Sequence, residues 1–158
     1  MSEQYYIKAI RAAEIKHNLP NGLLIAVAKR ESNMQMLGVH SDGTSTGMFG
    51  LRESTSIAEY IERVGSRPDL GSVEGQAEVA GWYLGNRIPK MIKYYKKPVT
   101  VRNQIIAYNA GISYVQGGDT PPDITLDYIE FVNAELENVK KPNLYRCPSC
   151  LLHLQLVQ

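Results

Sequence analysis

Glu31 and Ser32 end an apolar stretch of the chain, and Glu31 is the residue best placed for acid–base chemistry. Residues 23–28 form an almost unbroken apolar run, which predicts a helix that is buried on all sides. With this helix expected over residues 21–32, Glu31 lies at the end of a core helix and is partly withdrawn from water. Because burial disfavours the charged form of a carboxyl, we expect the pKa of Glu31 to be raised. A carboxyl that keeps its proton near neutral pH can act as a general acid.

Two further segments contain residues suited to a binding site. Residues 37–50 contain four glycines, which are too many for a helix and predict turns. Residues 107–111 read Ala-Tyr-Asn-Ala-Gly and lie at the end of a helix expected over residues 100–110. A buried tyrosine packs its ring and needs a partner for its hydroxyl. Tyr108 is therefore a candidate for the core or for the site.

In this order and at this spacing, the glutamate, the glycine-rich turn and the tyrosine motif resemble the catalytic domain of lytic transglycosylases of the soluble type. That family shares its fold with goose-type lysozyme, and its members cleave the glycan strands of bacterial peptidoglycan. The similar segments are residues 19–32, 41–56, 81–84 and 107–111, and the resemblance covers roughly residues 5–135. Gly50 stands where the family usually has a glutamine that contacts sugar. The resemblance thus implies weaker sugar binding. Gly50→Gln is expected to tighten it, provided that the glycine does not occupy a conformation forbidden to other residues.

The resemblance implies a mainly α fold, of the α+β lysozyme-like kind. In this fold a single helical domain carries a small hairpin or loop lobe that lines a substrate cleft. Hydrophobic periodicity and the prolines and glycines predict helices at residues 3–17, 21–32, 54–64, 73–86, 87–96 and 100–110, and a last one after Pro121-Pro122. Asn21 is the expected N-cap of the second helix. In the first helix we expect Ile15 to face the core and Glu14 the solvent, and in the last one Ile124 and Tyr128 to share an apolar stripe.

By the same resemblance, Glu31 is the catalytic residue. It would donate a proton to the glycosidic oxygen of the β-1,4 bond between N-acetylmuramic acid and N-acetylglucosamine. Most glycosidases use two carboxylates, but Asp42 and Glu53 lie near the turn at positions that the family does not mark as catalytic. A single glutamate suffices if the substrate N-acetyl group assists departure and Glu31 then takes the proton from the muramoyl 6-hydroxyl. The expected product is a 1,6-anhydromuramoyl end, formed without water.

The substrate-binding candidates are Ser32, Gly47, Met48, Phe49, Tyr108 and Asn109. Ser32 would hydrogen-bond the substrate or brace the cleft. Tyr108 would hold the catalytic carboxyl through its hydroxyl, unless it is simple core. Met48 and Phe49 form either an apolar floor for a sugar ring or part of the core. Asn109 belongs to a residue type that tolerates the left-handed conformation, so it also suits the turn after its helix.

Two other functions fit the same residues. A goose-type muramidase would hydrolyse the same bond with water and leave a reducing muramic acid end. A non-catalytic wall-binding or assembly module that kept the fold is the second alternative, and the glycine at position 50 is the feature that suggests it.

The bulk composition narrows the classes of partner. With 17 basic and 16 acidic residues the formal net charge is +1, so the overall charge gives no reason to expect nucleic acid or membrane binding. No stretch approaches the roughly 20 apolar residues of a membrane span. Four lysines lie within residues 90–97. They form either a solvated helix face or a surface that attracts an anionic wall polymer. The acidic N-terminal residues do not resemble a secretory signal. We therefore expect the enzyme to reach the periplasmic cell wall through a phage virion or a holin-made lesion, with a virion or a secretion machinery as a partner.

Residues 1–141 make up the expected domain, and residues 142–158 form a tail of different character. The tail leucines are too apolar for a free terminus, so we expect the tail to pack on the domain or on a partner. Cys147, Cys150 and His153 fall short of the four ligands of a structural zinc site. Free thiols or a short disulfide are expected there, and neither a metal nor a cofactor is predicted. His17 and His40 are isolated and are expected on the surface or in loops.

Overall fold

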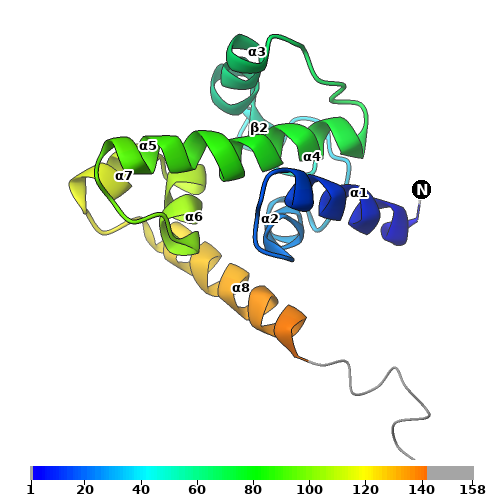
Figure 1. Cartoon of the computed structure of the whole chain (residues 1–158). Helices are drawn as coiled ribbons and strands as arrows, with labels where there is room; N and C mark the ends of the chain where they lie inside the picture. Colours follow the sequence, from blue (N-terminus) through cyan, green and yellow to red (C-terminus); the bar gives the residue numbers. More distant parts are fainter. Residues whose placement is uncertain (1, 142–158) are drawn as a thin grey trace, which may run out of the picture.

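Helices dominate the computed structural model, which describes residues 2–141 (Figure 1). The α-helices are α1 (Glu3–Lys16), α2 (Leu23–Ser32), α3 (Ala58–Val64), α4 (Val73–Trp82), α5 (Ile88–Tyr94), α6 (Val101–Asn109), α7 (Ile112–Gly117) and α8 (Asp123–Lys140). Two short strands, β1 (Ser45–Thr46) and β2 (Leu51–Arg52), pair antiparallel, with Ser45 opposite Arg52. Two π-helical turns, η1 (Glu53–Ile57) and η2 (Tyr83–Arg87), lead directly into α3 and α5. The predicted mainly α fold with a small hairpin is confirmed.

Most helices lie where the sequence predicts them, but the break expected between residues 86 and 87 is absent. Instead α4, η2 and α5 run end to end as one long helix across the molecule (Figure 1). Pro89 lies in the first turn of α5, and a proline there removes a helical N–H and crowds the preceding turn. The wider π-helical turn just before Pro89 accommodates this without ending the helix. The sequence does not predict α7, because six residues are too few to show a helical period.

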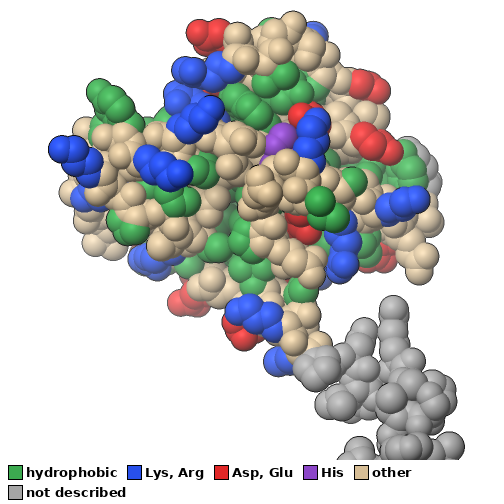
Figure 2. Space-filling model, viewed as in Figure 1, with side chains coloured by type: hydrophobic (Ala, Val, Ile, Leu, Met, Phe, Trp, Pro, Cys, Tyr) green, Lys and Arg blue, Asp and Glu red, His purple; other side chains and the backbone are tan. Residues whose placement is uncertain are grey.

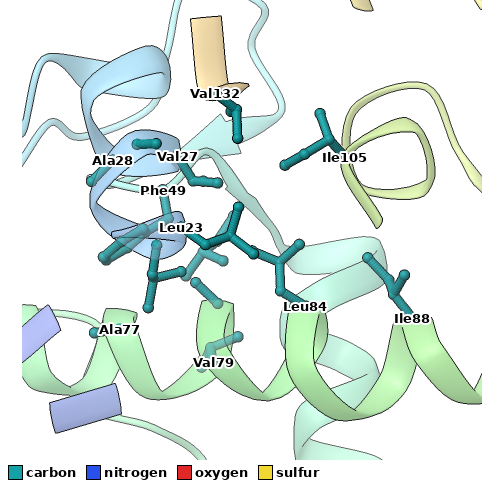
Figure 3. Packing of buried hydrophobic residues seen from close by; sticks show 14 of the residues in the cluster. Leu23, Val27, Ala28, Phe49, Ala77, Val79, Leu84, Ile88, Ile105 and Val132 are labelled. Carbon is teal, nitrogen blue, oxygen red and sulfur yellow. The ribbon is translucent and has the colours of Figure 1, made fainter. Parts of the chain in front are cut away.

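The core lies where α2 meets the long helix, α6 and α8. Figure 3 shows Leu23 and Val27 of α2 among Leu84, Ile105 and Val132, which come from η2, α6 and α8. All residues at positions 23–28 are buried, which confirms the prediction of a helix buried on all sides. Burying an apolar side chain of this size stabilises a fold by roughly 1.5–3 kcal/mol. Because α2 is packed on several sides, its C-terminal end, which carries Glu31, has a fixed position.

The start of α2 is capped from another helix, so the prediction that Asn21 is its N-cap is wrong. The helix begins after Gly22, and the carboxylate of Glu14 from α1 accepts hydrogen bonds from three backbone N–H groups. These come from Gly22 at 3.1 Å, Leu24 at 2.8 Å and Ile25 at 3.3 Å. A negative charge is favourable at a helix N-terminus, where the N–H groups lack helical acceptors. This explains why Glu14 is only 2% exposed, against the prediction that it faces solvent.

Three other side chains lie on the opposite side from the one predicted. Ile15 is 79% exposed and Ile124 is 64% exposed, although both were expected to face the core. The inward positions beside them belong to polar residues with specific partners. His17, expected on the surface or in a loop, lies in the turn after α1 but is buried, and its ring nitrogens bond Glu78 at 3.0 Å and Asn86 at 2.9 Å. Buried polar groups with partners displaced apolar ones here, which a hydrophobic pattern does not reveal.

The exposed surface carries mixed charge. In Figure 2 basic and acidic side chains are interspersed over the face shown, in keeping with a formal net charge of +1. Lys90, Lys93 and Lys96 are exposed on and after α5, as the solvated-face interpretation expects. Across residues 2–141, no helix is both long and apolar enough to cross a membrane. The predictions for the tail and for Cys147, Cys150 and His153 concern residues outside those described.

Candidate functional site

The turn between β1 and β2 is fastened to the C-terminal end of α2. The Ser32 hydroxyl donates a hydrogen bond to the Met48 carbonyl (2.9 Å) and accepts one from the Gln35 N–H (3.0 Å). The Met48 N–H in turn donates to Oε1 of Gln76 on α4 (2.7 Å). Ser32 is 8% exposed, so of its two predicted roles the structure supports the bracing of the cleft. The turn therefore lies close to Glu31, the residue that precedes Ser32 on α2.

Met48 and Phe49 are part of the core, so of the two roles expected for them the structure supports the core and not an apolar floor for a sugar ring. Both side chains are fully buried, and Figure 3 shows Phe49 beside the α2 residues Leu23 and Val27. Their apolar side chains gain more from the core than from a solvated cleft. Gly47 is buried as well, and its carbonyl accepts a hydrogen bond from Nε2 of His40 (2.7 Å). These residues shape the turn through their backbone.

Tyr128, and not Tyr108, bonds the Glu31 carboxyl. The Tyr128 hydroxyl on α8 donates to Oε1 of Glu31 at 3.0 Å. The Tyr108 hydroxyl donates to the Phe49 carbonyl at 2.6 Å, so the prediction that it holds the carboxyl is wrong. In the sequence Tyr128 is only one member of an apolar stripe, although a tyrosine in such a stripe needs a hydroxyl partner. It lies 97 residues from Glu31, and no local pattern joins the two.

Burial raises the pKa of Glu31 above its ordinary value of 4.5, as predicted. The Tyr128 hydrogen bond opposes this shift, as do the charges of His40, Arg30 and Arg52 to a smaller degree. Burial also raises the pKa of Tyr128 well above its ordinary value, with Glu31 adding to the shift. Tyr128 is thus a neutral hydroxyl donor at any physiological pH. Glu31, held by Tyr128, can therefore carry a proton and donate it to a ligand in the adjacent hollow.

Two hollows share part of their lining, and Glu31 lines the first of them. The first, of about 280 Å³, is lined by Glu31, His40, Ser41, Asp42, Ser45, Gly50, Arg52, Tyr108, Asn109 and Ile124. The second, of about 140 Å³, is lined by Gly50, Arg52, Thr55, Ser56, Tyr83 and residues 107–111. The candidates Tyr108 and Asn109 are thus brought together with Glu31, and Asn109 is oriented from α8 by the Thr125 hydroxyl at 2.6 Å. His40, expected to be an isolated loop residue, lines the first hollow.

Asp42 is the second carboxylate among the residues that line these hollows, but its environment differs from that of Glu31. Its oxygens accept hydrogen bonds from the Ser45 hydroxyl (2.6 Å) and from the N–H groups of Ser45 (2.8 Å) and Thr44 (2.9 Å). These bonds lower the pKa of Asp42 well below its ordinary value. Glu53 does not line either hollow and pairs with Arg67 at 3.0 Å. Glu31 and Asp42 therefore differ sharply in acidity.

Gly50 leaves room for the Glu31 carboxyl. Its φ of +61° is in the left-handed region that favours glycine. A Cβ at this position would lie 2.4 Å from Oε2 and 2.8 Å from Cδ of Glu31, too close for either atom to stay in place. The condition attached to the expectation that Gly50→Gln tightens binding is therefore not met, because Gly50 has a backbone conformation that other residues rarely adopt.

The model of the transglycosylase SLT domain family matches residues 8–118. This range contains Glu31, the glycine-rich turn and the motif around Tyr108, and it ends before α8 and Tyr128. No curated protein and no solved structure matches the chain.

Gly50→Ala should displace the Glu31 carboxyl and lower its pKa toward 4.5, since the added Cβ expels the carboxyl from its buried position. Gly43→Ala is the matched control. Gly43 has a similar φ of +69° but no atom within 4 Å of an added Cβ. Both variants should lose about 1–2 kcal/mol of unfolding free energy from the left-handed backbone, but only Gly50→Ala should change the carboxyl titration, followed by 13C NMR. An unchanged Glu31 titration in Gly50→Ala would contradict the steric argument.

Tyr128→Phe should raise the pKa of Glu31 further. In the wild type the Tyr128 hydrogen bond stabilises the charged carboxylate, and the variant loses that bond. Tyr108→Phe removes a hydroxyl that bonds the Phe49 carbonyl instead. It should cost about 1–3 kcal/mol of unfolding free energy by leaving a buried carbonyl without its partner, without raising the Glu31 pKa. The same NMR titration, together with urea unfolding, separates the two tyrosines. The assignment fails if both variants move the Glu31 titration equally.

Proposed function

This chain belongs to the transglycosylase SLT domain family, whose members are peptidoglycan lytic transglycosylases, and we propose that Glu31 alone supplies its acid–base catalysis. The bond cleaved is the β-1,4 bond between N-acetylmuramic acid and N-acetylglucosamine. The observation that carries the proposal is the position of Glu31, whose carboxyl lines a hollow, has a raised pKa and is held by a neutral tyrosine hydroxyl. How the protein reaches the wall, by a phage virion, a holin or a secretion machinery, stays a prediction.

Two proton transfers describe the reaction. Protonated Glu31 gives its proton to the glycosidic oxygen, and the bond from that oxygen to the anomeric carbon of the muramoyl residue breaks. The acetamido group of the same sugar stabilises the anomeric carbon during departure. The Glu31 carboxylate then takes the proton of the muramoyl 6-hydroxyl, whose oxygen bonds to the anomeric carbon. Glu31 ends protonated as it began, the product is a 1,6-anhydro sugar, and no water is consumed.

The state of Asp42 supports this route over hydrolysis. An inverting hydrolase needs a second carboxylate that removes a proton from water. A carboxylate with a strongly lowered pKa is a weak base, and the oxygens of Asp42 already accept three hydrogen bonds from its own loop. Glu53 is engaged with Arg67 outside the hollows. The states of Asp42 and Glu53 therefore disfavour the muramidase.

The mass of the products tests the mechanism. Digested peptidoglycan should contain fragments with anhydromuramoyl ends, each lighter by one water than the corresponding hydrolysis fragment. Fragments with a reducing muramic acid end would favour the muramidase instead. A folded protein that releases no fragments and leaves a wall suspension turbid would favour the binding module.

Glu31→Gln should reduce the rate of wall cleavage by about 100- to 10,000-fold or more, since general acid catalysis alone contributes that much and the same group is also the base. The wild-type rate should fall as pH rises through the raised Glu31 pKa, because the deprotonated carboxyl cannot act as the acid. Glu53→Gln is the control. Glu53 is exposed and begins η1, directly after β2, so this variant should leave the rate near wild type. A folded Glu31→Gln variant with near-normal turnover would exclude Glu31 as the acid.

A further inference from the structure

Arg52 lies at the junction of the two hollows. It is one of four residues that line both, together with Gly50, Tyr108 and Asn109. Among the lining residues of the two hollows it is the only lysine or arginine. Strand β2 fixes its backbone through the pairing of Arg52 with Ser45. A permanent positive charge is therefore held where a bound glycan would pass from one hollow to the other.

The guanidinium of Arg52 is held only loosely by its neighbours. Its Nε lies 3.4 Å from Oγ of Ser45, and its terminal nitrogen lies 3.7 Å from Oδ2 of Asp42, which is beyond hydrogen-bond distance. An arginine has five N–H donors, so most of them are left without a protein acceptor at close range. Its side chain is 51% exposed.

Asp42 does not depend on Arg52 for its own stabilisation. Three hydrogen bonds from Ser45 and Thr44 already satisfy its carboxylate. Elsewhere in the described chain an arginine does engage a carboxylate fully, as Arg67 engages Glu53 at 3.0 Å. The longer distance at Asp42 leaves the planar fork of Arg52 able to turn toward a ligand.

We propose that Arg52 binds a carboxylate of the substrate and makes the site prefer anionic muramoyl glycans over neutral glycans. This inference rests on the proposed function, because it takes peptidoglycan as the substrate. Peptidoglycan carries carboxylates either on the free lactyl group of muramic acid or on its peptide stem. A guanidinium fork matches both oxygens of a carboxylate, which gives direction as well as attraction. Asp42, at 3.7 Å, offsets part of the positive charge of Arg52 without forming a hydrogen bond to it.

Binding of uncleaved ligands to the Glu31→Gln form, measured by titration calorimetry with and without Arg52→Gln, tests the proposal. Four ligands of equal length separate the sources of charge. They are N-acetylglucosamine oligomers, muramoyl oligomers with free lactyl carboxylates, the same oligomers with those groups converted to methylamides, and muramoyl oligomers with peptide stems. Arg52→Gln should weaken the binding of ligands with carboxylates on the order of fivefold, as expected for a partly exposed ion pair. It should leave the affinity for the neutral oligomers unchanged. The loss of affinity caused by Arg52→Gln should be smaller at high salt.

The pattern of losses identifies the carboxylate. Loss on the free lactyl ligand but not on its methylamide assigns the lactyl group, and loss confined to the stem-bearing ligand assigns the peptide. Arg67→Gln, which changes an exposed arginine outside the hollows, is the matched control and should change none of the affinities. Equal losses on neutral and charged ligands, or no loss on either charged ligand, overturn the proposal. If wild type cleaves peptidoglycan while Arg52→Gln binds all ligands normally, only this inference fails. If wild type neither binds nor cleaves muramoyl glycans, the proposed function fails with it.

Discussion

The Glu31 carboxyl occupies a space that exists only because residue 50 has no side chain. One carboxyl oxygen, Oε2, lies 2.4 Å from the position that a Cβ of residue 50 would take, and the other, Oε1, accepts a hydrogen bond from the Tyr128 hydroxyl of α8. The carboxyl is therefore enclosed between a backbone turn on one side and a helix on the other. This enclosure removes water from the group and raises its pKa. The raised pKa that the proposed chemistry requires thus follows from the burial of the carboxyl, which outweighs the opposing effect of the Tyr128 hydrogen bond.

The turn that leaves this gap is positioned by three different helices. Ser32 of α2 and Tyr108 of α6 donate to the carbonyls of Met48 and Phe49, and Gln76 of α4 accepts the Met48 N–H. All three bonds lie at or below 2.9 Å, and each satisfies a backbone group that would otherwise be buried without a partner. The buried side chains of Met48 and Phe49 add the attraction of the core. The intact helical bundle is what fixes the distance between the turn and Glu31.

The sequence predicts those parts of this arrangement that are local. The apolar run of α2 and its position next to Glu31 are visible without any partner, and so is the glycine-rich character of the turn. The Tyr128 hydrogen bond and the Glu14 cap join residues that are distant in the chain or on different helices, and a hydrophobic pattern contains no information on such pairs. Gly50 shows the same limit, because its left-handed backbone and the nearness of Glu31 are properties of the folded turn.

The raised pKa also has a consequence for stability. A carboxyl whose folded pKa lies above its unfolded value contributes most to stability at low pH, where it is protonated in both states, and that contribution is lost as pH rises through the folded pKa. Above that folded pKa the ionised, enclosed Glu31 opposes folding. The core around α2 offsets this, as do the hydrogen bonds of the turn. The packing that looks purely structural is thus what allows a destabilising carboxyl, the proposed general acid, to persist at the end of a core helix.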